Sequence, residues 1–142
     1  MSDISQKKNA VSFSEFKSDM MKLSQKLHTK IIACNAIITC ENYFSCQVMY
    51  KEQTISILCN TVYPLIGICE AENPNIIPRK FVSIEELENY ISGLRNYTVV
   101  SPEFLHSSVV GSAIEDLSVQ ELSNINYWRP KEINEIVFNF WD

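Results

Sequence analysis

The hydrophobic positions between residues 11 and 31 recur at steps of three and four, which predicts an amphipathic helix. Ser12 and Glu15 fit the S-x-x-E capping box, and Val11 with Phe16 fits the hydrophobic staple that accompanies such a box. The predicted apolar face consists of Phe13, Phe16, Met20, Leu23, Leu27 and Ile31. Three lysines at intervals of four fall on another face, which indicates a solvated side of the helix.

The pattern then changes to four runs with strand-like composition, at about 31–40, 43–50, 53–59 and 62–69. Connections this short join antiparallel neighbours, so the sequence predicts a β-meander. The runs mix apolar and polar positions, which is typical of a sheet with one covered face. Because Pro64 has no N–H to donate to a ladder, we expect it at an edge or a bulge.

A second capping box, Ser83 with Glu86, predicts a helix that Gly93 ends. Its apolar stripe is formed by Ile84, Leu87, Ile91 and Leu94. Residues 96–101 then indicate one more strand, which Pro102 terminates.

A third box, Ser118 with Glu121, predicts a short helix, and Pro130 suits the first turn of a final one. The predicted buried side of that final helix consists of Ile133, Ile136, Val137, Phe140 and Trp141. Because these residues keep helical spacing, we expect most of them to close the protein's own core, with a subunit contact as the alternative.

The predicted order is α-β-β-β-β-α-β-α-α, which defines an α+β fold. An antiparallel β-meander of about five strands packs with N-terminal, middle and C-terminal helices. We expect residues 1–10 to be a polar leader and residues 11–142 to form a single globular domain, because 142 residues suffice for one core.

Composition excludes several classes of protein. With only three glycines, the chain has no glycine-rich phosphate loop. Five cysteines without a C-x-x-C pair match neither a complete disulfide set nor a zinc ribbon, and they indicate buried thiols in a reducing compartment. The sequence holds no secretion signal and no apolar run long enough to span a membrane, so we expect a cytoplasmic protein.

Charge is distributed unevenly along the chain. The net charge is −5, yet residues 1–30 carry six lysines against three acids, and the remaining residues carry six bases against fourteen acids. An acidic surface repels nucleic acid and attracts basic partners. Seven acids are candidates for partner binding: Glu70, Glu72, Glu85, Glu86, Glu88, Glu115 and Asp116. Tyr90 and Tyr97 are candidate aromatic anchors near them.

The sequence offers no convincing catalytic constellation. His106 lies among serines and could be paired with a cysteine or serine nucleophile, but many chains of this composition allow such a pair. His28 lies within the lysine-bearing helix, and two histidines without an H-E-x-x-H pattern do not indicate a metal site. We therefore expect no enzyme, no cofactor and no metal.

The ending "YWRPKEINEIVFNFWD" resembles that of many small bacterial immunity proteins, which close on a similar W-x-P-x-x-x-x-E-x-x-F-N-x-W-D helix. The matching positions are Trp128, Pro130, Glu135, Phe138, Asn139, Trp141 and Asp142. The resemblance implies a short, acidic, cytosolic antitoxin that binds the C-terminal domain of a cognate toxin and neutralises it. Such toxins belong to polymorphic or contact-dependent growth-inhibition systems and are frequently basic nucleases.

A type III secretion chaperone that binds an effector leader is the alternative. Those proteins are also small, acidic and α+β, and the first 70 residues fit their element order, whereas the last forty fit less well. Under either hypothesis the partner is a protein rather than nucleic acid or a membrane, and the chain is a monomer or a homodimer. An enzyme that uses His106 is the third class considered.

Overall fold

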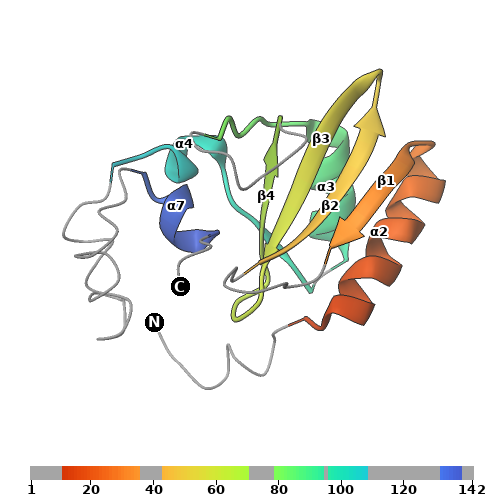
Figure 1. Cartoon of the computed structure of the whole chain (residues 1–142), viewed down its shortest axis with the longest axis horizontal. Coiled ribbons are helices and arrows are strands. Elements are labelled where there is room, and N and C mark those ends of the chain that lie inside the picture. Colours follow the sequence, from red (N-terminus) through yellow and green to blue (C-terminus); the bar gives the residue numbers. More distant parts are fainter. Residues whose placement is uncertain (1–10, 36–42, 71–78, 95, 109–131, 139–142) are drawn as a thin grey trace.

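The computed structural model describes residues 11–35, 43–70, 79–94, 96–108 and 132–138, and it confirms the predicted α+β fold (Figure 1). One five-stranded sheet, in the order β1-β2-β3-β4-β5, has helices packed against it. The predicted polar leader and the predicted helix that follows Ser118 lie outside the described residues.

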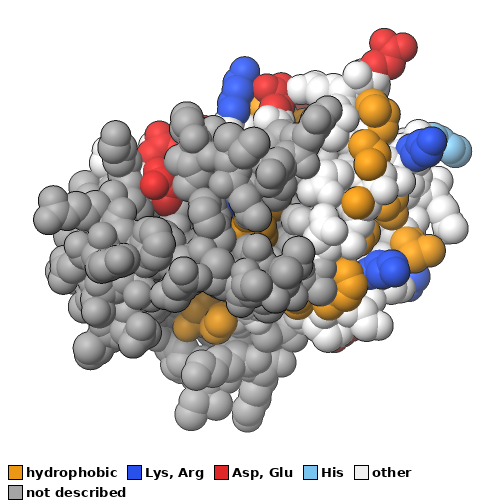
Figure 2. Space-filling model, viewed as in Figure 1, with side chains coloured by type: hydrophobic (Ala, Val, Ile, Leu, Met, Phe, Trp, Pro, Cys, Tyr) orange, Lys and Arg blue, Asp and Glu red, His pale blue; other side chains and the backbone are white. Residues whose placement is uncertain are grey.

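Helix α2 (Phe13–Leu27) begins with the predicted capping box. Ser12 Oγ accepts a hydrogen bond from the Glu15 N–H at 3.1 Å, and the Glu15 carboxylate accepts one from the Ser12 N–H at 3.5 Å. His28 ends the helix in the left-handed conformation, with φ of 56°, and its N–H donates to the Ser24 carbonyl. Figure 2 shows lysine side chains (blue) over the side of the molecule where α2 and β1 lie, as expected for a solvated helix face.

The first four strands form the predicted antiparallel meander: β1 (Lys30–Asn35), β2 (Tyr43–Tyr50), β3 (Gln53–Asn60) and β4 (Leu65–Cys69). The fifth strand, β5 (Thr98–Val99), pairs with β4 in parallel, which corrects the expectation of an antiparallel neighbour. The reason is topological, because the chain leaves β4, crosses over through a helix and re-enters the sheet in the same direction.

The position of Pro64 differs from the expectation of an edge or a bulge. Strand β4 lies between β3 and β5, and Pro64 stands immediately before its first residue, Leu65. A proline at that point removes no donor from the strand. Its carbonyl oxygen accepts a hydrogen bond from the Thr98 N–H at 2.9 Å, so Pro64 helps to align the parallel pair.

Helix α3 (Glu85–Gly93) forms where the sequence predicts it, and Leu87 and Ile91 of the predicted stripe are buried. The predicted box of Ser83 and Glu86 is wrong, because Ile84 occupies the N-cap position and makes no side-chain capping bond. The carboxylate of Glu88 instead accepts the Ile84 N–H at 3.2 Å, which leaves Glu86 free to make a contact outside the helix.

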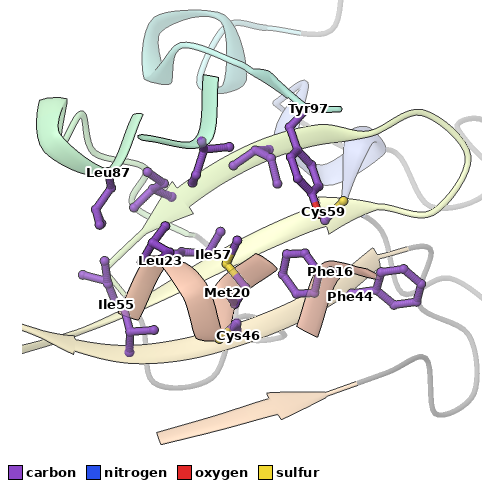
Figure 3. Packing of buried hydrophobic residues seen from close by; sticks show 14 of the residues in the cluster. Phe16, Met20, Leu23, Phe44, Cys46, Ile55, Ile57, Cys59, Leu87 and Tyr97 are labelled. Carbon is purple, nitrogen blue, oxygen red and sulfur yellow. The ribbon is translucent and has the colours of Figure 1, made fainter. Parts of the chain in front are cut away.

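Helices α2 and α3 cover one face of the sheet (Figures 1 and 3). Figure 3 shows Phe16, Met20 and Leu23 of α2 beside apolar side chains of β2 and β3. The first core cluster is centred on Phe16, Met20, Leu23, Phe44, Cys46, Val48, Ile55, Ile57, Cys59, Ile66, Ile68, Leu87 and Ile91. Removing this much apolar surface from water is the main stabilising contribution to the fold.

The opposite face is covered as well, which corrects the expectation of a sheet with one covered face. Six consecutive residues of β2 (43–48) and six of β3 (55–60) are buried, so both sides of these strands are shielded. The second core cluster comprises Tyr43, Leu58, Cys69, Phe81, Leu105 and Phe138. It includes the last residue of the short helix α4 (Pro102–Leu105) and the residue after α7 (Asn134–Val137).

The described part of the C-terminal segment packs into the protein's own core. Ile133, which the sequence predicts to be buried, is 4% exposed, whereas Val137 of the same predicted set is only half-buried. Phe138, which the predicted set does not include, is fully buried against the sheet. The side chains of Ile136, Phe140 and Trp141, also predicted to be buried, lie beyond what the structure describes.

Candidate partner-binding surface

Five glutamates project from one end of the sheet, and we call this surface the acidic end: Glu52, Glu70, Glu85, Glu86 and Glu88. They come from the β2–β3 turn, the residue after β4 and the first turn of α3. Tyr50 and Gln53, the last register pair of β2 and β3, connect the three elements through their side chains.

Tyr50 fixes the carboxylate of Glu86 on α3. The Tyr50 hydroxyl donates to Glu86 Oε1 at 2.7 Å, and this charge-assisted bond raises the pKa of Tyr50. The Tyr50 ring packs at the margin of the first core cluster, and the Lys51 Nζ lies 5.4 Å from its centroid. A partly exposed aromatic ring thus lies directly beside the acids of the helix.

Gln53 and Lys80 fix the carboxylate of Glu70 at the end of β4. The Gln53 amide donates to Glu70 Oε2 at 2.6 Å, and the Lys80 Nζ lies 3.3 Å from Glu70 Oε1. These two partners, Gln53 first, lower the pKa of Glu70, so it stays ionised at neutral pH. Lys80 offsets part of its charge, whereas Glu52, Glu85 and Glu86 are exposed to solvent.

The turn that carries Glu52 has an unusual backbone for its residues. Lys51 and Glu52 both have positive φ, 47° and 67°, as in the tight type I′ turn that joins two antiparallel strands. Asn-Gly is the usual sequence there, because other side chains pay a steric cost in this conformation. The unbroken β2–β3 register holds the turn and places a lysine and a glutamate at the tip of the hairpin.

The two predicted aromatic anchors differ in their positions. Tyr90 is half-buried, packs against the first core cluster and follows Glu86 by one helical turn. Tyr97 departs from the expectation of an exposed anchor, because it is 6% exposed and its hydroxyl donates to Asp19 Oδ2 at 2.6 Å. Tyr97 is therefore a core residue, and both its burial and the bond to Asp19 raise its pKa.

The structure therefore brings together four of the predicted partner-binding acids: Glu70, Glu85, Glu86 and Glu88. Glu72, Glu115 and Asp116 fall in ranges outside the described residues. Sequence reasoning missed Tyr50, Gln53 and Glu52. Only the position of "YKEQ" between two strand-like runs pointed to the hairpin tip, and nothing local linked that tip to α3.

His106 has both ring nitrogens engaged by the protein. Its Nε2 accepts the Phe81 N–H at 2.9 Å, and its Nδ1 lies 2.9 Å from Glu132 Oε1. A nitrogen that accepts from an amide carries no proton, so in the neutral ring Nδ1 bears the hydrogen and donates to Glu132. His106 thus connects Phe81, which pairs with Cys69 of β4, to Glu132 of the C-terminal segment. Neither ring nitrogen is left free to act on a substrate.

Arg79 belongs to a second polar cluster, inside the molecule. It is 3% exposed, so it does not contribute to a basic surface, and burial lowers its pKa. Its guanidinium donates to the Asn134 carbonyl at 3.1 Å and lies over the Tyr43 ring, 5.3 Å from the centroid. Asn134 in turn donates to the Leu105 carbonyl at 2.9 Å. These bonds attach α7 to the sheet through groups that burial would otherwise leave unpaired.

The described ranges, 11–35, 43–70, 79–94, 96–108 and 132–138, hold neither a metal site nor a membrane-spanning helix. Within them, no group of three or more His, Cys, Asp or Glu side chains is arranged to hold a metal ion. None of the helices so described is long and apolar enough to cross a membrane.

Comparison with known proteins found no matching family model, no similar curated protein and no similar solved structure.

Proposed function

We propose that this chain is a bacterial immunity protein that binds a basic, nuclease-type toxin domain through the acidic end and so neutralises it. The observation that carries the proposal is the gathering of carboxylates from three elements, two of which are held in place: Glu86 by Tyr50 and Glu70 by Gln53. Carboxylates that are already ordered lose less conformational freedom when a partner binds, so more of the interaction contributes to affinity.

Charge complementarity supports the same proposal. The acidic end carries five carboxylates and two lysines, Lys51 and Lys80, while further lysines lie over α2 and β1 (Figure 2). A polarised charge distribution steers a basic partner towards one end of the molecule and disfavours other orientations.

Tight binding also needs an apolar centre that excludes water. Tyr50 and Tyr90 supply candidate anchors, because both are partly exposed and both lie close to Glu86. A tyrosine can keep its ring dry in an interface while its hydroxyl keeps a hydrogen bond, as Tyr50 already does with Glu86.

The free cysteines support a location in the bacterial cytoplasm. Cys34, Cys46, Cys59 and Cys69 are free thiols in the structure. Unpaired buried thiols are typical of proteins in reducing compartments.

Growth protection in a bacterial host tests the proposed function. The proposal predicts that a toxin domain is encoded beside this gene; that domain is expressed alone or together with the full chain, and the chain should restore growth. The double variant Glu85→Lys, Glu88→Lys should lose protection, whereas Glu103→Lys, an exposed acid on α4 away from the acidic end, should keep it. Circular dichroism establishes that each variant is folded.

Two results would overturn the proposal. One is unchanged growth arrest in the presence of the parent chain. The other is a purified complex in which the bound segment is an unfolded effector leader, because that partner identifies a secretion chaperone.

A further inference from the structure

Cys34 and Cys46 face each other across the first two strands. They are direct register partners on the antiparallel strands β1 and β2, and their Sγ atoms lie 3.0 Å apart in a thiol–thiol hydrogen bond. Directly opposed residues of an antiparallel pair have Cα atoms about 4.5–5.5 Å apart, which is within the range that a disulfide spans. A bond between the two sulfurs therefore needs no rearrangement of the backbone.

The two thiols differ in access to solvent. Cys34 is half-buried on β1, which is the outer strand of the sheet, whereas Cys46 is fully buried on β2. The hydrogen bond with Cys46 lowers the pKa of Cys34, and Lys17 on α2 adds to the effect, while the pKa of Cys46 is raised by the same bond and by burial. The accessible sulfur is thus the better nucleophile, and the protected sulfur lies in contact with it.

The other described cysteines have neither access to solvent nor a lowered pKa. Cys59 and Cys69 are buried, and desolvation raises the pKa of each to about 12. At neutral pH they hold far less thiolate than an unperturbed thiol, so they react poorly with peroxides. They serve as internal controls for reactivity.

We propose that Cys34 and Cys46 form a reversible oxidation site for peroxides. The Cys34 thiolate attacks a peroxide oxygen, the O–O bond breaks, and a sulfenic acid forms on Cys34 as hydroxide, or the alkoxide of an organic peroxide, leaves. The leaving oxygen takes up the proton that Cys34 released on ionisation and departs as water or as an alcohol. The Cys46 thiol then attacks the Cys34 sulfur, the S–O bond breaks, and a disulfide and water result. Each disulfide thus consumes one peroxide, which takes up the two electrons, and a dithiol reductant restores both thiols.

The product would join the outer strand β1 to its neighbour through a covalent bond. Because α2 packs on β1 and β2, the bond would restrain the same layer that the helix covers. Oxidation would therefore stabilise this side of the sheet rather than disrupt it.

Peroxide titration of the reduced full chain tests the proposal. Hydrogen peroxide in small excess should give one product that is lighter by two hydrogen atoms, with a higher thermal midpoint, and dithiothreitol should reverse both changes. After alkylation of the remaining thiols, cleavage at Lys30, Glu41 and Lys51 places Cys34 and Cys46 on separate peptides. The linked peptides should be recovered as one species until reduction.

Variants make the assignment unambiguous. Cys40 lies on the same peptide as Cys34, so the experiment is repeated in Cys40→Ser, which should still form the bond. Cys34→Ser and Cys46→Ser should lose it, and Cys59→Ser should retain it. A crosslink that disappears with Cys40→Ser, or oxidation of Cys34 to the sulfinic acid without a disulfide, overturns the proposal. Circular dichroism of every variant separates loss of reaction from loss of fold.

Discussion

Phe138 packs directly over Gly67, a residue on the central part of β4. A Cβ atom placed on Gly67 would lie 2.7 Å from Phe138 Cε2 and 2.8 Å from Phe81 Cε1, closer than real contacts allow. The rings of Phe81 and Phe138 stack with centroids 5.8 Å apart, so the pair fills the space that the missing side chain leaves. The absence of a side chain at one strand position therefore permits the second core cluster to form.

Replacing Gly67 with alanine should lower the free energy of unfolding by about 1–3 kcal/mol, because the added methyl group forces two buried rings apart. Urea unfolding followed by circular dichroism measures the change. Gly93→Ala is the matched control, since nothing lies within 4 Å of a Cβ there and Gly93 ends a helix. That substitution should raise stability by about 0.5–1 kcal/mol. Equal effects at both positions would contradict the packing described for Gly67.

Replacing His106 with alanine should lower the free energy of unfolding by about 1–3 kcal/mol, because the N–H of the buried Phe81 loses its acceptor. His106→Gln places an amide oxygen close to the former Nε2 and should recover part of the loss. Denaturant unfolding of the three proteins at one pH provides the comparison. No difference between alanine and glutamine would mean that the ring contributes by packing against Phe81 rather than by accepting its N–H.

Replacing His28 with glycine should stabilise the protein by about 0.5–1 kcal/mol. His28 ends α2 with φ of 56°, a conformation that glycine adopts without steric cost and other residues do not. The side chain is exposed, so little packing is lost. A rise in thermal midpoint measures the gain, and a fall would show that the imidazole makes a stabilising contact in solution.

Stability should fall in alkali as the buried thiols resist ionisation. The unfolded Cys59 thiol ionises near pH 9, whereas burial raises the pKa of the folded thiol to about 12. Between these values the folded state holds more protons than the unfolded state, so the free energy of unfolding decreases as pH rises. Below pH 9 the contribution is fully present.

Cys59→Ser isolates this contribution. The serine hydroxyl does not ionise in this range and can keep the hydrogen bond to the Asn60 carbonyl. The free energy of unfolding of parent and variant is measured in urea from pH 8 to pH 11. It should decline less steeply with pH in the variant than in the parent, by up to about 1.4 kcal/mol per pH unit. Parallel curves for the parent and the variant would contradict the assignment to Cys59.

Association with a basic partner should depend on salt through the acidic end. If the proposed toxin domain is the partner, the association rate should fall at least about tenfold as ionic strength rises from about 0.01 M to about 0.15 M. Glu85→Lys with Glu88→Lys should flatten that dependence, and Glu103→Lys should leave it nearly unchanged. Surface-immobilised binding kinetics measure the rates. A dissociation rate that changes while the association rate does not would place these acids outside the steering surface.

Tyr50→Phe examines the aromatic contribution separately. The variant keeps the ring but removes the hydroxyl that holds Glu86, so the partner should dissociate faster by a few-fold while the association rate stays within about twofold. Tyr50→Ala removes the ring as well and should accelerate dissociation further, by more than about tenfold if the ring is an anchor. Identical dissociation rates for the phenylalanine and alanine variants would exclude an anchoring role for the ring.

Elements that depend on neighbouring residues were predictable from the sequence. Helix α2 was anticipated down to its first hydrogen bonds, because a capping box and an apolar stripe are local patterns. The four strands of the meander follow for the same reason, since short connections leave antiparallel pairing as the only solution.

Features that depend on distant residues were not predictable. The predicted capping box at Ser83 does not form, because the helix begins one residue later, and Glu86 bonds instead to Tyr50, thirty-six positions away in the chain. Tyr97 was expected at the surface, but Asp19 on α2 accepts its hydroxyl and makes its burial tolerable. The alternation in β2 indicated one covered face, because buried polar side chains such as Gln47 resemble solvent-facing ones in a sequence.

The candidate surface was predictable in composition but not in arrangement. The acids of α3 stand next to one another in the sequence, whereas Glu52 and Glu70 join them only through the hairpin register. No local pattern in the sequence shows that Tyr50 donates a hydrogen bond to Glu86 of α3, or that Gln53 donates one to Glu70 after β4.

The covering of the second sheet face has a consequence for synthesis on the ribosome. Helix α2, the meander and α3 can assemble their shared cluster once residue 99 has emerged, whereas the surface around Tyr43, Leu58 and Gly67 is not fully covered until Phe138 arrives. During that interval a nascent chain displays an apolar strand surface, the kind that chaperones recognise and that other chains can join. The emergence of Phe138 thus completes the second cluster, and slow elongation just before this residue would prolong the most aggregation-prone stage.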